Sequence, residues 1–291
     1  MIKCQRGLNL SPAAGWWARV GAPGKAQGGL PHDGVVAAGD AQRGRAASTA
    51  AGTCPFAVDR PVMRQRWQQL TFVHWPFEPE QVQRLLPPGL VADLFDGAAW
   101  VGLVPFFMHV GTARGRQLPW VSRFCETNVR TYVHDRAGLP GIWFFSLDAA
   151  RFGAVAVARA TYRLPYYWSA MRIVRQGQEI SYWCRRRLPG PAGLTSQVRI
   201  GIGEPYAAGE LAARDHFLTA RWTLFSPALG PDDRPGLARA CHDPWPLHRA
   251  EAHAVDDHLL AAAGLPPVRD EPLVHYSPGV DVAISRPERG D

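Results

Sequence analysis

The segment 124–134 carries polar side chains whose types suit proton transfer and anion binding. Alternate residues of an extended strand face the same side, and the row on one side consists of Glu126, Asn128, Arg130, Tyr132 and His134. A carboxyl group can transfer a proton and a guanidinium can grip an oxyanion, while an amide and a phenol orient ligands through hydrogen bonds. We therefore take Glu126 and Arg130 as candidate catalytic residues. Asn128 and Tyr132 are candidate substrate-binding residues.

The neighbouring segment 142–148 helps to decide what this polar row does. Aromatic and branched residues fill both of its faces, which is typical of a strand buried on both sides. A polar row beside a buried strand favours the wall of a pocket, whereas the alternatives are a structural polar network and a plain solvent-exposed face. Residues four apart on a strand lie about 13 Å apart, so we do not expect Glu126 and Arg130 to pair directly.

Aromatic residues that are near the row in the sequence are candidates for the same pocket. Trp143 and Phe145 lie in the buried strand, and Tyr166 begins a later strand candidate. We add these three as candidate substrate-binding residues. The alternative for each is an ordinary place in the hydrophobic core, where aromatic side chains contribute most of their stabilising energy.

Other patterns for catalysis or metal binding are missing from the sequence. The histidines at 242, 248, 253 and 258 have separations that fit neither the i, i+4 pair of a metal-binding helix nor the i, i+2 spacing of one strand face. There is no GxSxG nucleophile motif, and the segment 201–203 falls far short of a dinucleotide-binding loop. We therefore expect no metal and no cofactor.

One acidic residue and one run of arginines receive a structural interpretation. Asp148 is placed to cap a helix expected at 149–160. Arg185, Arg186 and Arg187 follow one another in a strand, so that Arg186 must face away from its two neighbours. We interpret this run as an exposed sheet edge, where charge discourages aggregation between sheets.

Composition and charge are those of a globular protein that does not bind nucleic acid. The chain has 291 residues, of which 46% are hydrophobic and 20% charged, enough for a sizeable core. Its formal net charge is +7, but residues 1–62 hold seven basic against three acidic residues, which leaves 25 against 22 for residues 63–291. No nucleic-acid-binding motif accompanies this small excess. No window approaches the roughly 18 apolar residues that a membrane span needs.

The cysteines suggest a reducing compartment. They stand at 4, 54, 125, 184 and 241, an odd number with wide spacing and without a CxxC pair. Such spacing indicates neither a disulfide framework nor a structural zinc site. Together with the lack of a signal-peptide pattern, this predicts a cytoplasmic protein.

Residues 1–62 differ from the rest of the chain. They contain ten glycines and show no sustained hydrophobic period, which predicts a disordered Gly/Ala-rich tail. The composition changes at Met63, and we hypothesise that translation starts at this residue. Residues 63–291 are expected to form a single domain.

Hydrophobic alternation and turn residues predict a fold rich in strands. Strands are expected at 66–75, 90–95, 99–109, 123–134, 141–147, 166–175, 178–187, 195–202, 220–226, 237–242, 247–254 and 273–284, and short helices at 79–86, 149–160, 210–217 and 256–263. This pattern predicts an α+β protein dominated by β-structure, with mostly antiparallel strands in a closed or half-closed barrel or cone and a few short helices.

Several segments, taken in order, resemble one known family. They are 72–76 (FVHWP), 85–90 (LLPPGL), 96–106 (DGAAWVGLVPF), 126–132 (ETNVRTY), 141–148 (GIWFFSLD), 164–166 (LPY) and 275–282 (HYSPGVDV). This combination resembles the YqjF-like proteins, an uncharacterised bacterial family in the acetoacetate-decarboxylase-like superfamily. The resemblance implies a β-rich barrel or cone around a central cavity, and it brings no known activity.

The chain departs from the superfamily's namesake at the residue that performs its chemistry. That enzyme decarboxylates a β-keto acid through a lysine that forms a Schiff base. Here the only lysines are Lys3 and Lys25, both in the predicted tail, and an arginine cannot replace them because it stays protonated. Imine chemistry is therefore excluded from the domain, while a cavity with Arg130 as a carboxylate-binding residue remains.

These observations leave three functions open. The leading one is a cavity that binds a small anionic or carbonyl-bearing organic molecule, as a non-Schiff-base lyase, isomerase or hydrolase. The alternatives are a non-catalytic binding or sensing protein and a structural partner-binding domain. We expect a small-molecule ligand, such as a carboxylate, and no nucleic-acid or membrane partner. The sequence leaves open whether the chain forms a homo-oligomer.

Overall fold

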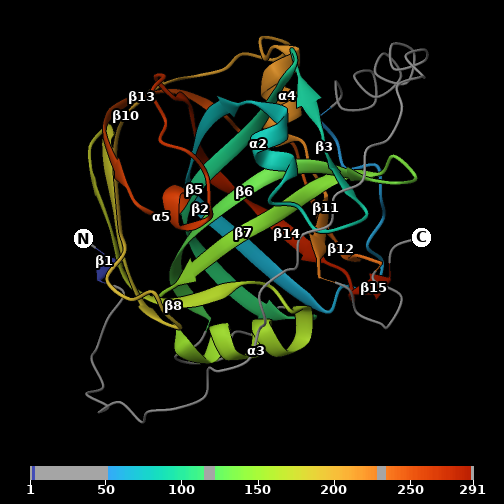
Figure 1. The fold of residues 1–291 in the computed structure, drawn as a ribbon. Coiled ribbons are helices and arrows are strands. Elements are labelled where there is room, and N and C mark those ends of the chain that lie inside the picture. The colour runs from blue at the N-terminus through green and yellow to red at the C-terminus, as the bar shows by residue number, and fades with distance from the viewer. Residues whose placement is uncertain (1, 4–51, 115–121, 228–233, 290–291) are drawn as a thin grey trace.

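The computed structural model describes residues 2–3, 52–114, 122–227 and 234–289 (Figure 1). Most of the predicted tail lies outside these residues. The strands are β1 (Ile2–Lys3), β2 (Met63–Phe77), β3 (Leu90–Ala92), β4 (Leu94–Phe95), β5 (Ala98–Thr112), β6 (Arg123–Asp135), β7 (Pro140–Ala149), β8 (Tyr166–Gln176), β9 (Glu179–Leu188), β10 (Thr195–Pro205), β11 (Thr223–Ser226), β12 (Gly236–His242), β13 (His248–Asp257), β14 (Leu273–Ile284) and β15 (Glu288–Arg289). The helices are α2 (Pro79–Gln83), α3 (Phe152–Tyr162), α4 (Ala213–Thr219) and α5 (Leu259–Ala262).

The predicted dominance of β-structure is confirmed. All strands belong to one mixed sheet in which hydrogen-bonded neighbours follow the order β8-β9-β10-β13-β14-β2-β5-β6-β7. Because β7 also pairs with β8, this path returns to its start. A second path leads from β7 through β11 and β12 to β14. The strands β14, β2, β5, β6 and β7 belong to both paths and form their common wall (Figure 1).

The expectation of antiparallel strands is right only in part. Most neighbours are antiparallel, but β7 runs parallel to both β8 and β11. Parallel neighbours need a crossover connection, and α3 provides it between β7 and β8. Alternation within a strand cannot reveal this, because it does not depend on the direction of the neighbour.

Burial differs between the common wall and the rest of the sheet. In the central parts of β5 (99–108) and β6 (124–133) every residue is buried, on both faces. In β9 and β10 buried and exposed or half-buried residues alternate, as is usual for strands with one face in water. The helices are short, and no helix among the described residues is long and apolar enough to cross a membrane.

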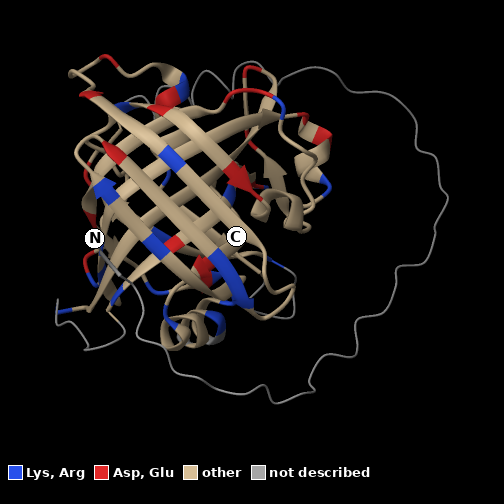
Figure 2. Ribbon diagram, turned by 90° about the vertical axis from the view of Figure 1, so that its left-hand side faces the viewer, with Lys and Arg blue, Asp and Glu red and all other residues tan. Residues whose placement is uncertain are grey.

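Charged residues are interspersed along the strands. Figure 2 shows Lys and Arg positions (blue) and Asp and Glu positions (red) scattered over the side of the sheet that faces the viewer. Salt bridges between neighbouring strands contribute to this pattern, such as that between Arg199 of β10 and Glu179 of β9 at 3.2 Å. Exposed pairs of this kind contribute little to stability.

Asp148 and Arg186 have other roles than those expected from the sequence. α3 begins at Phe152 with Arg151 as its N-cap residue, so Asp148 does not cap it. Asp148 lies in β7, where its carboxylate accepts hydrogen bonds from Arg186 Nε at 2.9 Å, Arg186 Nη2 at 2.6 Å and Ser169 Oγ at 2.6 Å. The interpretation of the arginine run as an exposed edge is therefore wrong for Arg186, whose side chain is only 2% exposed.

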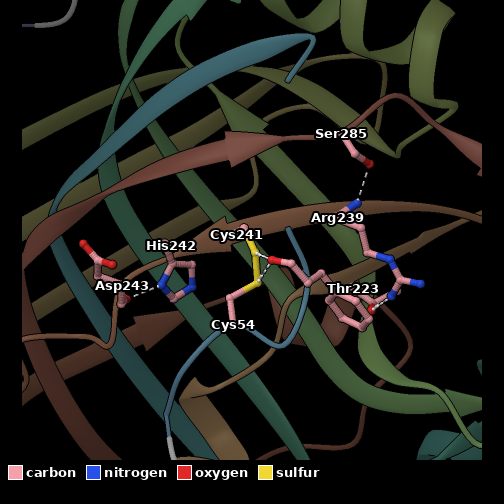
Figure 3. The surroundings of a disulfide bond; sticks show 8 residues. Cys54, Thr223, Arg239, Cys241, His242, Asp243 and Ser285 are labelled. Atoms are coloured by element: carbon pink, nitrogen blue, oxygen red, sulfur yellow. Dashed lines mark hydrogen bonds between the residues drawn. A yellow bond between two sulfur atoms is a disulfide. The ribbon is translucent and has the colours of Figure 1, made fainter. Parts of the chain in front are cut away.

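A disulfide bond also corrects an expectation. Cys54 and Cys241 are bonded, with their Cα atoms 5.7 Å apart, and this bond joins the segment before β2 to the end of β12 (Figure 3). The same segment places the ring of Phe56 3.9 Å from the guanidinium carbon of Arg239. Disulfides are rare in reducing compartments. A cytoplasmic location therefore loses this support and stays a prediction.

The Asp148–Arg186 pair allows a first prediction. Replacing Arg186 by Met should lower the free energy of unfolding by about 3–5 kcal/mol, because it leaves a buried carboxylate without its cation. Chemical denaturation measures this loss. The matched control is Arg185→Met, which removes the exposed neighbour on the opposite face and should change stability by less than about 0.5 kcal/mol. Equal effects of the two substitutions would contradict the structural role of the pair.

Candidate functional site

The common wall of the two strand paths lines a cavity of about 460 Å³. Side chains of β2, β5, β6 and β7 form one side, α3 and β8 contribute another, and β11 and β12 complete the enclosure. The volume lies within the range of about 300–1,000 Å³ that is usual for small-molecule sites. Most of the lining is apolar, and the polar side chains are few.

β6 contributes most of the predicted polar residues to this cavity. Glu126, Asn128 and Arg130 all line it, as alternation along one strand face requires. Tyr166, at the start of β8, joins them because the parallel pairing of β8 with β7 brings it next to the cavity. The structure thus brings together four of the residues proposed from the sequence.

Three other proposed residues do not line the cavity. Tyr132 is fully buried outside the cavity, where its phenol donates a hydrogen bond to the Leu218 carbonyl oxygen at 2.6 Å. The phenol oxygen of Tyr132 also lies 2.6 Å from His74 Nε2, which therefore donates a hydrogen bond to it. Trp143 and Phe145 lie on the other face of β7.

Their neighbours on β7 take their place. Ile142, Phe144 and Leu147 line the cavity. A register shift occurs between β6 and β7 at Val129 and Arg130, and such an irregularity changes which residues face inward. The sequence predicted a strand with two apolar faces but could not say which face turns inward.

Glu126 is a buried carboxyl group that is protonated at neutral pH. It is 2% exposed, and the Tyr166 hydroxyl donates a hydrogen bond to its Oε2 at 3.2 Å. Burial raises the pKa of Glu126 from 4.5 to about 8; the bond from Tyr166 opposes this shift, and the negative charge of Asp148 adds to it. A carboxyl group in this state can donate a proton to a bound molecule.

Arg130 is a buried cation without a carboxylate partner among the described residues. It is 6% exposed, and its guanidinium carbon lies 5.2 Å from the ring centre of Phe72 and 5.8 Å from that of Tyr132. Among the described residues, neither its Nε–H group nor Oδ1 of Asn128 has a hydrogen-bond partner. Buried polar groups in proteins are normally satisfied, so each of these two atoms has an unused hydrogen-bonding position.

A second arginine in the cavity is fully engaged. Arg221 donates hydrogen bonds to the Asp93 carboxylate at 2.7 Å and to the Phe217 carbonyl oxygen at 2.8 Å. Its charge is therefore balanced within the protein. The contrast with Arg130 shows that burial in this cavity does not by itself leave an arginine unpaired.

His242 lines the cavity as well, and sequence reasoning gave it no role. Its Nδ1 lies 2.7 Å from the Asp243 carbonyl oxygen (Figure 3). Burial lowers the pKa of His242, and the nearby charge of Arg130 adds to this effect, so the ring is neutral at pH 7. Nδ1 then carries the proton that is donated to the carbonyl, and Nε2 is left as an acceptor. Only the long-range pairing of β12 with β14 and β11 positions this residue, which leaves no local signal in the sequence.

The other histidines considered for metal binding lie apart from the cavity. His248 and His258 are bonded to Gly203 and Thr195, and His253 is 3.1 Å from Glu179. Within the part of the chain that the structure describes, no three His, Cys, Asp or Glu side chains are grouped so that they could hold a metal ion.

The raised pKa of Glu126 gives a pH-dependent prediction. The folded chain holds this proton more tightly than the unfolded chain, so the free energy of unfolding should fall as pH rises from 4.5 to about 8 and level off above that. Replacing Glu126 by Gln removes this dependence. The variant should therefore gain on the order of 4 kcal/mol relative to wild type between pH 5 and pH 9.

Denaturant titrations at several pH values measure this difference. Glu251→Gln, on the exposed face of β13, is the control and should keep a constant difference from wild type. A difference between Glu126→Gln and wild type that is the same at pH 5 and pH 9 would show that Glu126 is ionised in the folded protein.

Solved structures share this fold. An acetoacetate decarboxylase-like enzyme from Sphingomonas wittichii RW1 superposes with a TM-score of 0.54 and 14% identity, covering 82% of this chain and 99% of that chain. The enduracididine biosynthesis enzyme MppR complexed with pyruvate gives 0.55 and 13%, covering 81% and 93%. Acetoacetate decarboxylase from Legionella pneumophila gives 0.52 and 12%, covering 82% and 92%. Identities this low show the fold alone.

Sequence relatives are closer. The uncharacterized protein YqjF of Bacillus subtilis (strain 168) is 34% identical over 224 residues, which are 76% of this chain and 89% of that protein. The family model DUF2071, described as an uncharacterized conserved protein, matches residues 64–281. The resemblance seen in the sequence is thereby confirmed, and this chain belongs to the DUF2071 family.

Proposed function

We propose that this protein binds a small organic carboxylate in the cavity, with Arg130 as the residue that holds the anion. The observation that carries this proposal is the buried guanidinium that has neither a carboxylate partner nor an acceptor for Nε–H among the described residues. A buried cation is costly unless it is paired, and a bidentate carboxylate fits its geometry well. The unpartnered Asn128 amide oxygen, one step along β6, is available to a donor group of the same ligand.

The strand path through β11 and β12 supports this function. Its hydrogen-bonded strands surround the cavity, which is the arrangement that a closed or half-closed barrel would provide. The mostly apolar lining lowers the local dielectric constant, which strengthens the attraction between an anion and Arg130.

Glu126 and His242 would allow the cavity to catalyse a reaction. Burial moves their pKa values in opposite senses, so that a neutral carboxyl group and a neutral imidazole line the same cavity at pH 7. Two groups of this kind can act as proton donor and proton acceptor. This supports a lyase, isomerase or hydrolase that works by proton transfer and without a Schiff base.

The alternative to an enzyme is a protein that binds or senses the same ligand without catalysis. For binding alone, Arg130 and the apolar walls of the cavity are sufficient. A partner-binding domain has less support. It needs a contiguous exposed apolar patch. The exposed large hydrophobic residues in the described part of the chain come from separate segments and are Val91, Phe152, Leu188 and Val268.

A structural neighbour is consistent with a carboxylate ligand. The MppR structure named above contains pyruvate, a small carboxylate. Its low identity to this chain carries over no residue and no reaction. It supports only the idea that the fold can enclose a molecule of this class.

The test of the proposal compares Arg130→Gln with the matched control Arg221→Gln. Arg130 has no described acidic partner to leave stranded, so its loss should change the free energy of unfolding by less than about 1 kcal/mol. It should also weaken carboxylate binding about ten- to a hundredfold, which is the loss of a charge-assisted contact. Arg221→Gln strands Asp93 and should instead destabilise the fold by about 3 kcal/mol or more.

Thermal melts with and without pyruvate, 3-oxobutanoate, benzoate and hexanoate give both quantities. The assignment of Arg130 is wrong if Arg130→Gln is strongly destabilised and no carboxylate stabilises the wild type.

A separate prediction concerns the absence of imine chemistry. Incubation with 3-oxobutanoate and borohydride should give no covalent adduct on residues 63–291, because these residues include no lysine. Mass spectrometry of proteolytic fragments locates any adduct. Labelling of Lys3, Lys25 or the terminal amine is compatible with the prediction, whereas a stable adduct within residues 63–291 is not.

A further inference from the structure

We propose that the carboxylate ligand carries a hydrophobic chain, which extends from Arg130 along β6 towards α3. This rests on the proposed function and adds the chemical class of the ligand: an amphipathic monocarboxylic acid rather than a small polar one. The order of side chains along the cavity wall leads to this proposal.

The charged side chains of the cavity lie in the half around Arg130 and Glu126. Arg130 faces Gly102 of β5 and Phe144 of β7, and Glu126, four residues earlier on β6, faces Phe106. Arg221 is neutralised by Asp93, so Arg130 is the described cation that is free to hold an anion.

The other half of the cavity is mainly apolar, with the uncharged polar residues Gln65, Thr112 and Ser122 among its lining. The residue of β6 that faces the cavity before Glu126 is Phe124, which lies opposite Met108 of β5. Met108 in turn lies opposite Trp67 of β2. Further along the same strands Val110 and Met63 continue the lining, and no acidic or basic side chain among the described residues lines the cavity here.

α3 closes this apolar half with small residues. Its first turns lie beside the start of β6, since the Ala150 amide donates to the Cys125 carbonyl oxygen at 3.0 Å. Gly153, Ala154 and Ala158 of α3 line the cavity, and short side chains at these positions leave room next to Phe124. Figure 1 shows α3 across one end of the strands.

The length and volume of the cavity exceed what a small acid fills. Arg130 and Phe124 are six residues apart on one strand, which is about 20 Å at roughly 3.3 Å per residue. A volume of about 460 Å³ corresponds to on the order of fifteen water-sized groups at about 30 Å³ each. A four-carbon keto acid would leave most of the apolar half empty, whereas each added methylene extends the chain further towards α3 and fills more of it.

Binding of straight-chain acids tests the proposal. The probes are acetate, butanoate, hexanoate, octanoate and decanoate, measured by isothermal titration calorimetry with the full-length protein. The expected result is a gain in affinity of roughly three- to fourfold for each added methylene up to the length that reaches α3. Arg130→Gln should weaken every acid that binds by about the same factor, because the carboxylate end is common to all.

A pair of helix variants locates the chain. Ala158→Leu fills the apolar half and should weaken octanoate at least tenfold while leaving butanoate unchanged. Ala156→Leu, on the exposed face of the same helix, is the control and should change neither. Both substitutions keep a good helix former, and thermal melts verify that both variants fold.

The outcomes separate this inference from the proposed function. If affinity does not rise beyond butanoate, or if Ala158→Leu weakens butanoate as much as octanoate, the hydrophobic chain along β6 is ruled out while the carboxylate site stands. If no acid binds, or if Arg130→Gln binds them as tightly as wild type, both proposals fail.

Discussion

The ion pair between Asp148 and Arg186 holds the seam that closes the longer strand path. β7 and β8 pair over only three residues, and without this pairing the longer strand path would stay open. The buried pair, with Ser169 as a third member, joins β7 to β8 and β9 at this seam. The pair also affects the cavity. Tyr166 lies at the same seam, and its hydroxyl donates a hydrogen bond to Glu126. The negative charge of Asp148 contributes to the raised pKa of Glu126.

Burial of charge explains how the cavity differs from an ordinary core. A core excludes ionisable groups or pairs them, as this protein does with Arg186 and Arg221. Glu126 avoids the cost of burial by keeping its proton. Arg130 has neither solution available, since a guanidinium stays protonated and no described carboxylate approaches it. The protein retains a cation at a position that costs free energy, and a bound anion offsets this cost.

Much of the fold could be predicted from the sequence because its strands are long and regular. The strand expected at 273–284 coincides with β14, and the one expected at 123–134 differs from β6 by a single residue. The alternation of side chains along a strand also predicted that Glu126, Asn128 and Arg130 share one face. It predicted as well that the side chain of Arg186 points to the opposite face from Arg185 and Arg187. It could not show which face turns inward, and for that reason Arg186 was assigned to an edge. Tyr132, His242 and the disulfide depend on contacts between segments far apart in the chain, for which a single sequence holds no signal.

The position of β14 determines when the enclosure can form. Both closed paths pass through this strand, which pairs with β2 on one side and with β12 and β13 on the other. Its residues, 273–284, leave the ribosome after those of every other strand except β15. Until then β2 has an unpaired edge and the apolar wall of β5 and β6 is open to water. The chain therefore completes its hydrophobic interior only after β14 has been synthesised, through contacts between β2 and β14. This long-range closure is of the kind that makes folding slow.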